Sequence, residues 1–450
     1  MSTHLDARAE LEHKALRFLT AGSVDDGKST LIGRLLLDSR AILADQLDAL
    51  ERRAAGAPLD LSLLTDGLEA EREQGITIDV AYRYFATRRR KFIIADAPGH
   101  EQYTRNMVTA AAGSDAAVVL VDITKLDSAV ARVTLLPQTR RHSLLAQLLR
   151  VPSLVFAVNK LDAVADPRGA FEAVRAALLD FAEAAGICPA GIVPVSALRG
   201  DNVATRSAAW TWYDGPTLLQ LLESLPAADE RHDGALRLPV QYVARDERDG
   251  VGHQPRVLWG RIAQGRVQPG DAVRVLPGGV QAVVVEVRHA GDVVDGCEAG
   301  QSAGLVLDRQ LDVSRGDWIV AAAAPEAAVA VQEFDATLAW LDTDPAAVGR
   351  KYWVRHGNRW VQARITSIDS RLDIHTLADT GAHELAVNDI GRVRVQVQAP
   401  LPVQPYADNR VGGALIVVDP ATHRTSGALL VDRTGGAPPP QRVPTLTEVV

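Results

Sequence analysis

Residues 22–29 have the composition and spacing of a loop that holds phosphate groups. Their sequence, GSVDDGKS, places a glycine at each end of a short turn, followed by a lysine and a serine. Glycines allow backbone N–H groups to turn inward around phosphate oxygens, and a following helix presents its positive end to the same anion. Lys28 would supply positive charge to the outer phosphates, and Ser29 would offer a hydroxyl to Mg²⁺. The candidate phosphate-binding residues are Gly22, Ser23, Val24, Asp25, Asp26, Gly27, Lys28, Ser29 and Thr30.

A second candidate element is the turn 96–100, whose sequence is DAPGH. A carboxylate at the end of a strand can hold Mg²⁺ through a water molecule, and Gly99 lets a backbone N–H approach the γ-phosphate. His100 would then lie beside the attacking water. Taken alone, a turn of this kind is more often structural than functional, but its place downstream of the phosphate loop favours a magnesium–phosphate site. The candidates are Asp96, Ala97, Pro98, Gly99 and His100.

A third element, NKLD at residues 159–162, has the residue types that select a nucleotide base. The Asp162 carboxylate can accept hydrogen bonds from N1–H and the 2-amino group of guanine, two donors that adenine lacks. Because each such bond to a charged group is worth roughly 1.5–3 kcal/mol, the pair favours GTP over ATP by roughly 10²- to 10⁴-fold. Lys160 would lay its stem along the base, and the loop at Ser196 and Ala197 would give a backbone N–H to guanine O6. The candidates are Asn159, Lys160, Leu161, Asp162, Ser196 and Ala197.

Thr77, in the sequence GITI at residues 75–78, completes the set. Its hydroxyl can fill the Mg²⁺ shell, although a β-branched strand residue is an equally good interpretation without its neighbours. The order of all five elements predicts a GTPase with GTP and Mg²⁺ as ligands. We expect His100, Lys28 and Thr77 to act in catalysis, and Ser29, Thr77 and Asp96 to hold the metal, Asp96 through water.

The elements that must position these residues follow from apolar patterning. Short continuous apolar runs are typical of strands covered on both faces, and amphipathic stretches between them are typical of helices. We therefore predict an α/β GTPase domain with a mostly parallel sheet and helices on both faces. The predicted strands are 18–21, 92–95, 116–121 and 153–158, and the predicted helices are 30–38, 138–149 and 168–185.

After residue 237 the helical pattern stops and Val- and Gly-rich short strands with turn signals replace it. Close strand spacing of this kind predicts antiparallel β-barrels. We expect a GTPase domain at 15–230, a β-barrel domain at 236–325, a second β-barrel domain at 330–432 and a flexible tail at 433–450.

Composition and charge restrict the cellular location and the partners that we expect for this protein. The 450-residue chain is 47% apolar and 23% charged, and it shows no apolar run of the length that a membrane helix needs. The acidic N-terminal segment does not resemble a secretory signal, so we expect a cytoplasmic protein without a membrane. A net charge of −8 weakly disfavours nucleic acid as a partner. The cysteines Cys188 and Cys297 are predicted to be buried and inert, and residues 88–91 (RRRK) to form either a solvated hairpin turn or a basic partner patch.

These motifs resemble the elongation-factor-like GTPase superfamily, and within it the large subunit of the bacterial two-subunit sulfate adenylyltransferase (ATP sulfurylase). The resemblance covers roughly residues 17–432. It implies that GTP hydrolysis drives a separate small catalytic subunit, which forms adenosine 5′-phosphosulfate and pyrophosphate from ATP and sulfate for cysteine synthesis. It also implies a heterodimer or a higher assembly, with Thr77 as a switch residue and His100 positioning water. The matching stretches are KSTLIGRLL at 28–36, GHEQYTRNM at 99–107, QTRRH at 138–142 and WYDGPTLL at 212–219.

Several features depart from related patterns. Translation factors usually carry two histidines in the phosphate loop, where this chain has Ser23 to Asp26, and Ala97 stands where threonine is common. The stretch between Asp122 and Gln138 is longer than usual. No second GxxxxGK[ST] follows residue 330, so we expect no fused adenylylsulfate kinase. A translation factor, or a switch that drives no chemistry, remains the alternative.

Overall fold

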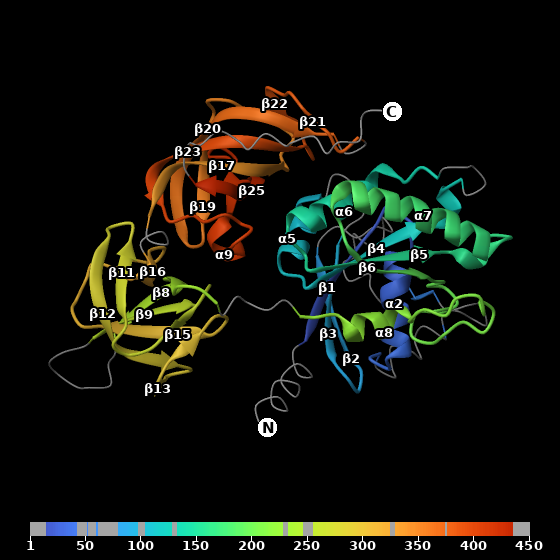
Figure 1. The fold of residues 1–450 in the computed structure, drawn as a ribbon, viewed down its shortest axis with the longest axis horizontal. Helices are drawn as coiled ribbons and strands as arrows, with labels where there is room; N and C mark the ends of the chain where they lie inside the picture. Colours follow the sequence, from blue (N-terminus) through green and yellow to red (C-terminus); the bar gives the residue numbers. More distant parts are fainter. Residues whose placement is uncertain are drawn as a thin grey trace, which may run out of the picture. The chain divides into compact units, whose positions relative to one another are not determined.

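The computed structural model describes residues 15–42, 52, 60–61, 80–97, 104–127, 133–227, 233–245, 255–324, 329–373 and 376–434. The chain divides into two compact units, one of residues 1–229 with 373–378 and one of the remainder (Figure 1). Within the described part of the chain, none of the helices combines the length and apolar character that a bilayer crossing requires.

The first unit is built on a mixed, mostly parallel sheet in the order β2-β3-β1-β4-β5-β6. Every pair except β2–β3 is parallel. Strands β4 and β5 are buried along their whole length, as expected for strands covered on both faces. The strands are β1 (Leu16–Ala21), β2 (Ala81–Ala86), β3 (Lys91–Asp96), β4 (Ala116–Asp122), β5 (Ser153–Asn159) and β6 (Pro189–Pro194).

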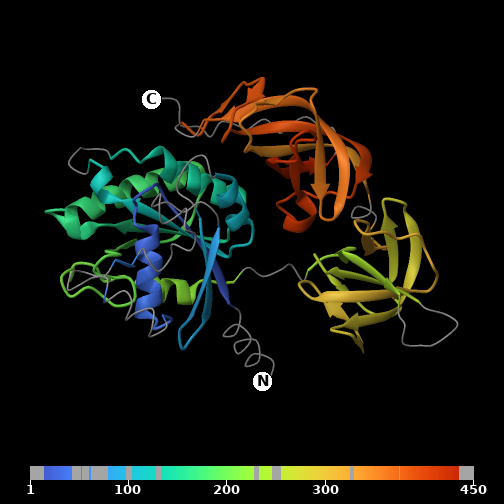
Figure 2. The same ribbon diagram turned by 180° about the vertical axis from the view of Figure 1, so that it is seen from behind.

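Helices cover both faces of this sheet (Figures 1 and 2). Apolar side chains of α2 and α8 share a core with alternate residues of β1, β3, β4 and β5, and α5, α6 and α7 lie on the opposite face. Their bounds are α2 (Lys28–Asp38), α5 (Thr104–Ala112), α6 (Pro137–Leu148), α7 (Pro167–Ala185) and α8 (Leu218–Ser224), with 3-10 turns η3 (Ile123–Lys125) and η4 (Leu161–Ala163). This confirms the predicted α/β class.

The second unit contains two antiparallel, barrel-like sheets. The first has the order β7-β16-β11-β12-β15-β9-β8, with β13 paired to β12 and a separate pair β10–β14. Its strands are β7 (Arg237–Pro239), β8 (Tyr242–Arg245), β9 (Arg256–Arg261), β10 (Arg266–Val267), β11 (Ala272–Leu276), β12 (Val280–His289), β13 (Asp292–Val294), β14 (Cys297–Glu298), β15 (Ser302–Leu307) and β16 (Trp318–Ala321).

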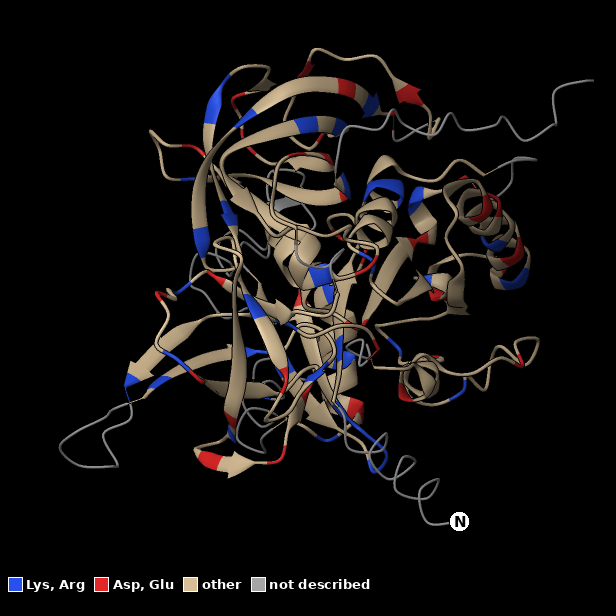
Figure 3. Ribbon diagram, turned by 60° about the vertical axis from the view of Figure 1, so that its left-hand side comes forward, with Lys and Arg blue, Asp and Glu red and all other residues tan. Residues whose placement is uncertain are grey.

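The other sheet has the order β19-β24-β25-β17-β23-β20-β21, and a further β19–β20 pairing closes it into a ring. Residues of both charges are distributed over the ribbon (Figure 3), and in this sheet Asp335 on β17 pairs with Arg394 and Arg433 on the two neighbouring strands, both at 2.8 Å. The elements are β17 (Val331–Trp340), β18 (Ala346–Ala347), β19 (Lys351–His356), β20 (Arg359–Leu372), β21 (Asp379–Thr380), β22 (Glu384–Leu385), β23 (Ile390–Leu401), α9 (Arg410–Gly413), β24 (Ala414–Val418) and β25 (Thr425–Thr434). Two barrels were predicted, and the limits 15–230, 236–325 and 330–432 remain our proposal for the domains.

Polar and aromatic groups join the two barrels inside the second unit. The ring of Trp318 stacks on that of His356, with centroids 5.1 Å apart, and the buried Arg237 guanidinium lies over Trp318. Arg237 also donates to the carbonyl of Pro402 at 2.7 Å, and Arg359 pairs with Asp317 at 2.7 Å. These contacts link strands of one sheet to strands and loops of the other, so the barrels share a buried interface.

One expectation about a single residue was wrong: Cys297 is buried, but Cys188 is exposed, because it lies in the turn between the end of α7 and the edge strand β6. The predicted hairpin turn before β3 is confirmed, since β2 and β3 pair antiparallel on either side of it. Within this turn Arg90 is buried and donates to the carbonyl of Leu225, and burial lowers the pKa of its guanidinium.

Candidate nucleotide-binding site

The candidate residues gather at one edge of the first sheet. The phosphate loop follows β1, Asp96 ends β3, Asn159 ends β5 and Ser196 follows β6. Because β1, β3, β4, β5 and β6 run parallel, their carboxyl ends meet at the same edge, where α/β sheets bind ligands. The structure therefore brings together the described parts of the three predicted motifs.

The phosphate loop has the backbone shape that its glycines predict. Gly27 is the residue before α2 and has φ +92°, in the left-handed region that favours glycine. A Cβ atom at Gly27 would lie 2.5 Å from Nδ2 of Asn159, so a side chain there is excluded by space as well. The loop and the base-selecting segment are thus packed directly against each other.

Side chains hold the carbonyl groups of this loop. Lys28 Nζ donates to the carbonyl of Gly22 at 3.0 Å and to that of Ser23 at 2.7 Å. Because C=O and N–H of a trans peptide point in opposite directions, a carbonyl that is held in place also fixes the direction of the next N–H. Burial lowers the pKa of the Lys28 ammonium, an effect that the nearby Asp96 and Asp26 carboxylates oppose. A buried cation within a loop of this kind is suited to a multiply charged anion.

Asn159 connects all three loops of the site. Its Nδ2 donates to the carbonyl of Asp26 at 2.8 Å, and its Oδ1 accepts from the backbone N–H of Ala197 at 3.0 Å. Arg34, on α2, donates from Nε to the carbonyl of Ala197 at 3.2 Å. The sequence identified Asn159 as a base-contact candidate, but its bridging role is visible only in the fold.

The base-selecting residues lie on the short turn η4 and the loop after β6. Lys160 has φ +64° and its ammonium pairs with Asp122 Oδ2 at 2.7 Å. Asp162 lies beside Arg199, with Oδ2 and Nε 3.5 Å apart. Ser196 is buried, and its hydroxyl accepts from the backbone N–H of Arg199 at 3.1 Å. Leu161 is fully buried in the core, so its side chain supports the turn and does not face a ligand.

Asp96 is the described part of the second motif. It is buried at the end of β3, opposite Thr20 in the β1–β3 register, and Oδ1 accepts from the Thr20 hydroxyl at 3.2 Å. Ala97 is buried beside it. The remaining candidates Thr77, Pro98, Gly99 and His100 lie outside the described residues.

The donor set at this edge fits Mg²⁺. Asp96 and Ser29 offer oxygen atoms, the ligand type that this hard cation prefers. Among the residues that the structure describes, His, Cys, Asp and Glu do not gather in threes as an all-protein metal site needs. Mg²⁺ characteristically binds through one or two protein oxygens together with phosphates and waters, so these residues suffice in the presence of a nucleotide.

Two charged residues at the site were missed by the sequence analysis. Asp122, at the end of β4, and Lys125, in η3, both lie against the predicted motifs. A carboxylate that ends a fully buried apolar run was the available signal for Asp122. For Lys125 no sequence signal existed, because its partner Asp26 is about a hundred residues away.

His142 is buried in α6 and does not lie on a free surface. Burial, with smaller contributions from Lys28 and Arg141, lowers its pKa to about 3. The imidazole is therefore neutral at physiological pH and is part of the buried interior of the unit.

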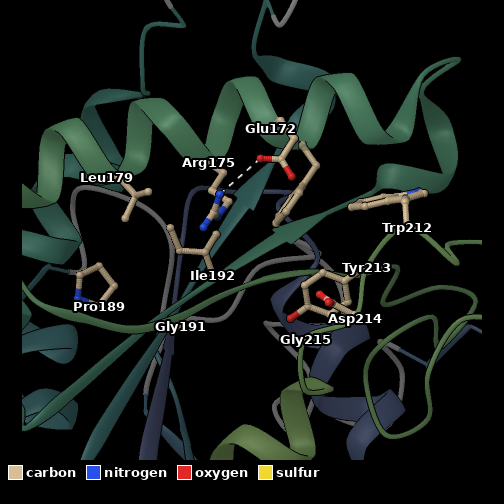
Figure 4. A pocket seen from close by; sticks show the side chains of 11 residues that line it. Glu172, Arg175, Leu179, Pro189, Gly191, Ile192, Trp212, Tyr213, Asp214 and Gly215 are labelled. Carbon is tan, nitrogen blue, oxygen red and sulfur yellow. Dashed lines mark hydrogen bonds and ion pairs between the residues drawn. The ribbon is translucent and has the colours of Figure 1, made fainter.

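A separate cavity of about 430 Å³ lies along the edge strand β6 and α7 (Figure 4). None of the nucleotide candidates lines it. Its wall is formed by aromatic and apolar side chains with the Glu172–Arg175 ion pair at the rim, and the lining residues include Phe171, Leu179, Pro189, Ile192, Trp212 and Tyr213.

The sheet order and the phosphate loop define a P-loop GTPase domain of the elongation-factor type, and family models agree. Residues 13–228 match the family model described as the elongation factor Tu GTP binding domain, and residues 333–432 match one described as GTP-eEF1A C-terminal domain-like. The first match establishes a GTP-binding domain in this chain.

More specific relatives carry the name sulfate adenylyltransferase subunit 1. Sulfate adenylyltransferase subunit 1 of Laribacter hongkongensis is 46% identical over 421 residues, which are 92% of this chain and 85% of the relative. The Salmonella typhimurium subunit 1 is 45% identical, over 95% of this chain and 88% of the relative. The bifunctional enzyme CysN/CysC of Xylella fastidiosa is 46% identical over 93% of this chain, which spans 65% of that longer protein. The chain belongs to the sulfate adenylyltransferase subunit 1 family.

Proposed function

We propose that this chain is the GTP-hydrolysing large subunit of a two-subunit sulfate adenylyltransferase. GTP and water become GDP and phosphate on this chain. A separate small catalytic subunit joins the AMP moiety of ATP to sulfate, giving adenosine 5′-phosphosulfate and pyrophosphate. The hydrolysis supplies the free energy for that unfavourable step, in the assimilation of sulfate into cysteine.

The observation that carries this proposal is the double hydrogen bond of Asn159. One side chain holds the phosphate loop through the carbonyl of Asp26 and the base loop through the N–H of Ala197. One side chain thereby holds together the loop proposed to receive the phosphates and the loop proposed to receive the base. Family membership adds the sulfate-activating reaction, since relatives about 45% identical over most of their length are called sulfate adenylyltransferase subunit 1. Translation factors share only the superfamily.

Within this proposal each motif binds a different part of GTP or its Mg²⁺ ion. Backbone amides of the phosphate loop and the Lys28 ammonium receive the phosphates, and Asp162 accepts hydrogen bonds from guanine. Ser29 and Asp96 hold Mg²⁺, with Thr77 as the third ligand group. When bound, Mg²⁺ supplies positive charge that stabilises the negative charge developing on the phosphoryl oxygens.

Hydrolysis is an in-line attack of water on the γ-phosphorus atom, with GDP as the leaving group. Lys28 and the inward N–H groups stabilise the charge of the transition state, and His100 orients the attacking water. P-loop GTPases with an incomplete site turn over slowly until a partner completes it, typically by a factor of roughly 10³ to 10⁵. We expect weak GTPase activity in the isolated chain and strong activation by the small subunit with ATP and sulfate. The proposal places this heteromeric complex in the cytoplasm, without a nucleic-acid or membrane partner.

The test is a coupled assay on this chain purified with the proposed small subunit from the same genome. Phosphate release from GTP and formation of adenosine 5′-phosphosulfate are measured together, with each component omitted in turn. We expect each reaction to depend on the other, and Lys28→Ala to abolish both. Lys91→Ala is the matched control, since Lys91 is exposed at the opposite end of β3. Adenylyl transfer that never responds to GTP would refute the proposed coupling while leaving GTP binding intact.

A further inference from the structure

The phosphate loop contains a buried negative charge. Asp26 is 0% exposed and lies directly before Gly27 and Lys28. A carboxylate inside a loop that receives phosphates is unfavourable unless a nearby cation compensates it, because like charges repel and a buried charge loses its hydration. The structure therefore has to supply a partner for Asp26 other than the phosphate-binding Lys28.

That partner is Lys125. Its ammonium lies 2.8 Å from Asp26 Oδ1, while Asp26 Oδ2 accepts the backbone N–H of Ser23 at 2.6 Å. The carboxylate is thus held on both oxygens, by a cation on one side and by the loop itself on the other. The Lys125 side chain is 32% exposed, so it reaches the buried Asp26 from the solvent side.

Lys125 also contacts the loop backbone. Its ammonium donates to the carbonyl of Val24. Because the N–H of a trans peptide points away from its C=O, this bond directs the N–H of Asp25 to the opposite side. Lys28 and Asn159 hold the carbonyls of Gly22, Ser23 and Asp26 in the same way, so Lys125 completes the set of side chains that fix the loop.

A third contact extends this arrangement to the base-selecting turn. Lys125 Nζ lies 3.9 Å from Asp122 Oδ2, and the same oxygen pairs with Lys160 Nζ at 2.7 Å. The buried carboxylate at the end of β4 therefore stands between the lysine that holds the phosphate loop and the lysine of the Asn-Lys-Leu-Asp segment. Opposite charges alternate from Asp26 through Lys125 and Asp122 to Lys160.

We propose that Lys125 is a positioning residue for nucleotide binding, which acts chiefly by neutralising Asp26, with a smaller contribution from its bond to the Val24 carbonyl. Without it, the unpaired Asp26 carboxylate opposes the incoming phosphates and the Asp25 N–H loses its orientation. The acidic Asp26 and the lysine at the start of the long β4–α6 segment form one functional pair. This inference rests on the proposed function only in requiring that the loop binds a guanine nucleotide.

The experiment compares the affinity of the full-length chain for a fluorescent GDP analogue and for GTP in a set of variants. Lys125→Met keeps the length of the side chain and removes its charge. Because it leaves Asp26 buried and unpaired, we expect both dissociation constants to rise by roughly 10- to 100-fold. Lys91→Met is the matched control for loss of a surface lysine and is expected to bind like the parent.

The decisive variant is the double substitution Asp26→Asn with Lys125→Met, measured beside Asp26→Asn alone to complete the cycle. Asparagine can still accept the Ser23 N–H but carries no charge, so the double variant is expected to recover affinity to within about threefold of the parent. A purely structural loss at Lys125 would not be rescued by a second substitution. Far-UV circular dichroism of each protein verifies folding.

The outcomes separate this inference from the proposed function. If the parent chain binds neither nucleotide, the proposed function itself fails. If the parent binds and Lys125→Met binds equally well, Lys125 does not position the loop. If Lys125→Met is weak and the double variant stays equally weak, Lys125 does not act through Asp26, and the proposal is overturned.

Discussion

Both units bury polar and charged side chains, but they arrange them in opposite ways. In the first unit Asp26, Lys28, Asp122 and Asn159 converge on one sheet edge, where they contact loop backbone groups and neighbouring lysines. In the second unit several buried groups, Arg237 and His356 among them, contact residues of the other barrel. There Arg237 donates to a carbonyl of the other barrel, and His356 stacks on Trp318.

The difference indicates what each set of groups is for. Polar groups that hold loop carbonyls leave amide N–H groups and a lysine available to a ligand, so the first set is arranged for binding. Polar groups that pair across two packed sheets leave little for a ligand and instead specify how the sheets meet. Substitutions in the first set should therefore change nucleotide affinity, and substitutions in the second should change stability.

The largest expected effect is a loss of base selectivity in the first unit without a comparable loss of stability. Asp162 pairs at 3.5 Å with Arg199, whose side chain is 64% exposed, so loss of this ion pair should cost little stability. Replacing it with alanine removes two charged hydrogen bonds to guanine and should reduce the preference for GTP over ATP by roughly 10²- to 10⁴-fold. Competition between the two nucleotides for the bound fluorescent analogue measures this ratio. Asp180→Ala, on the exposed side of α7, is the control, and an unchanged ratio in Asp162→Ala would exclude Asp162 from base selection.

The second unit should show the reverse behaviour. Trp318 is 1% exposed, and its ring lies between His356 and the Arg237 guanidinium. Trp318→Ala is expected to destabilise the unit by about 3–5 kcal/mol because it leaves a cavity between the barrels, with no change in GDP affinity. Guanidinium unfolding followed by circular dichroism gives the stability. Trp360→Ala removes the same residue type from a site that is 48% exposed and should cost far less. Equal losses in the two variants would contradict a specific role for the interface.

The sequence was sufficient for local structure but not for pairings between distant segments. The phosphate loop, the buried strands and the helices after them follow from glycine spacing and apolar periodicity, which act over a few residues. The pairing of Asp26 with Lys125 and the stacking of Trp318 on His356 depend on which segments the fold brings together, and no local pattern encodes them. Cys188 illustrates the same limit, since its exposure depends on β6 being the edge of the sheet.

The smallest expected effect is a pH dependence that originates in the second unit. His356 Nε2–H donates to the carbonyl of Gly412 at 3.0 Å. Burial lowers the pKa of the imidazole to about 4; the bond to Gly412 opposes this shift, and the charge of Arg237 adds to it. An unfolded histidine has a pKa near 6.5, so between these values the unfolded chain binds more protons than the folded one. The stability linked to His356 is therefore complete above about pH 6.5 and is lost as the pH falls toward about 4, by about 2 kcal/mol at pH 5.

His356→Gln tests this contribution, because an amide can still donate to the Gly412 carbonyl but does not titrate. Of the seven tryptophans, Trp259, Trp318, Trp340, Trp353 and Trp360 belong to the second unit, so tryptophan fluorescence follows its unfolding. We expect the parent to lose about 2 kcal/mol more than His356→Gln between about pH 7.5 and about pH 5. Parallel losses in the two proteins would mean that His356 is protonated without cost in the folded state. The buried polar groups between the barrels would then not be shown to contribute to stability. The contrast between polar groups that bind a ligand in the first unit and polar groups that stabilise the second unit would no longer hold.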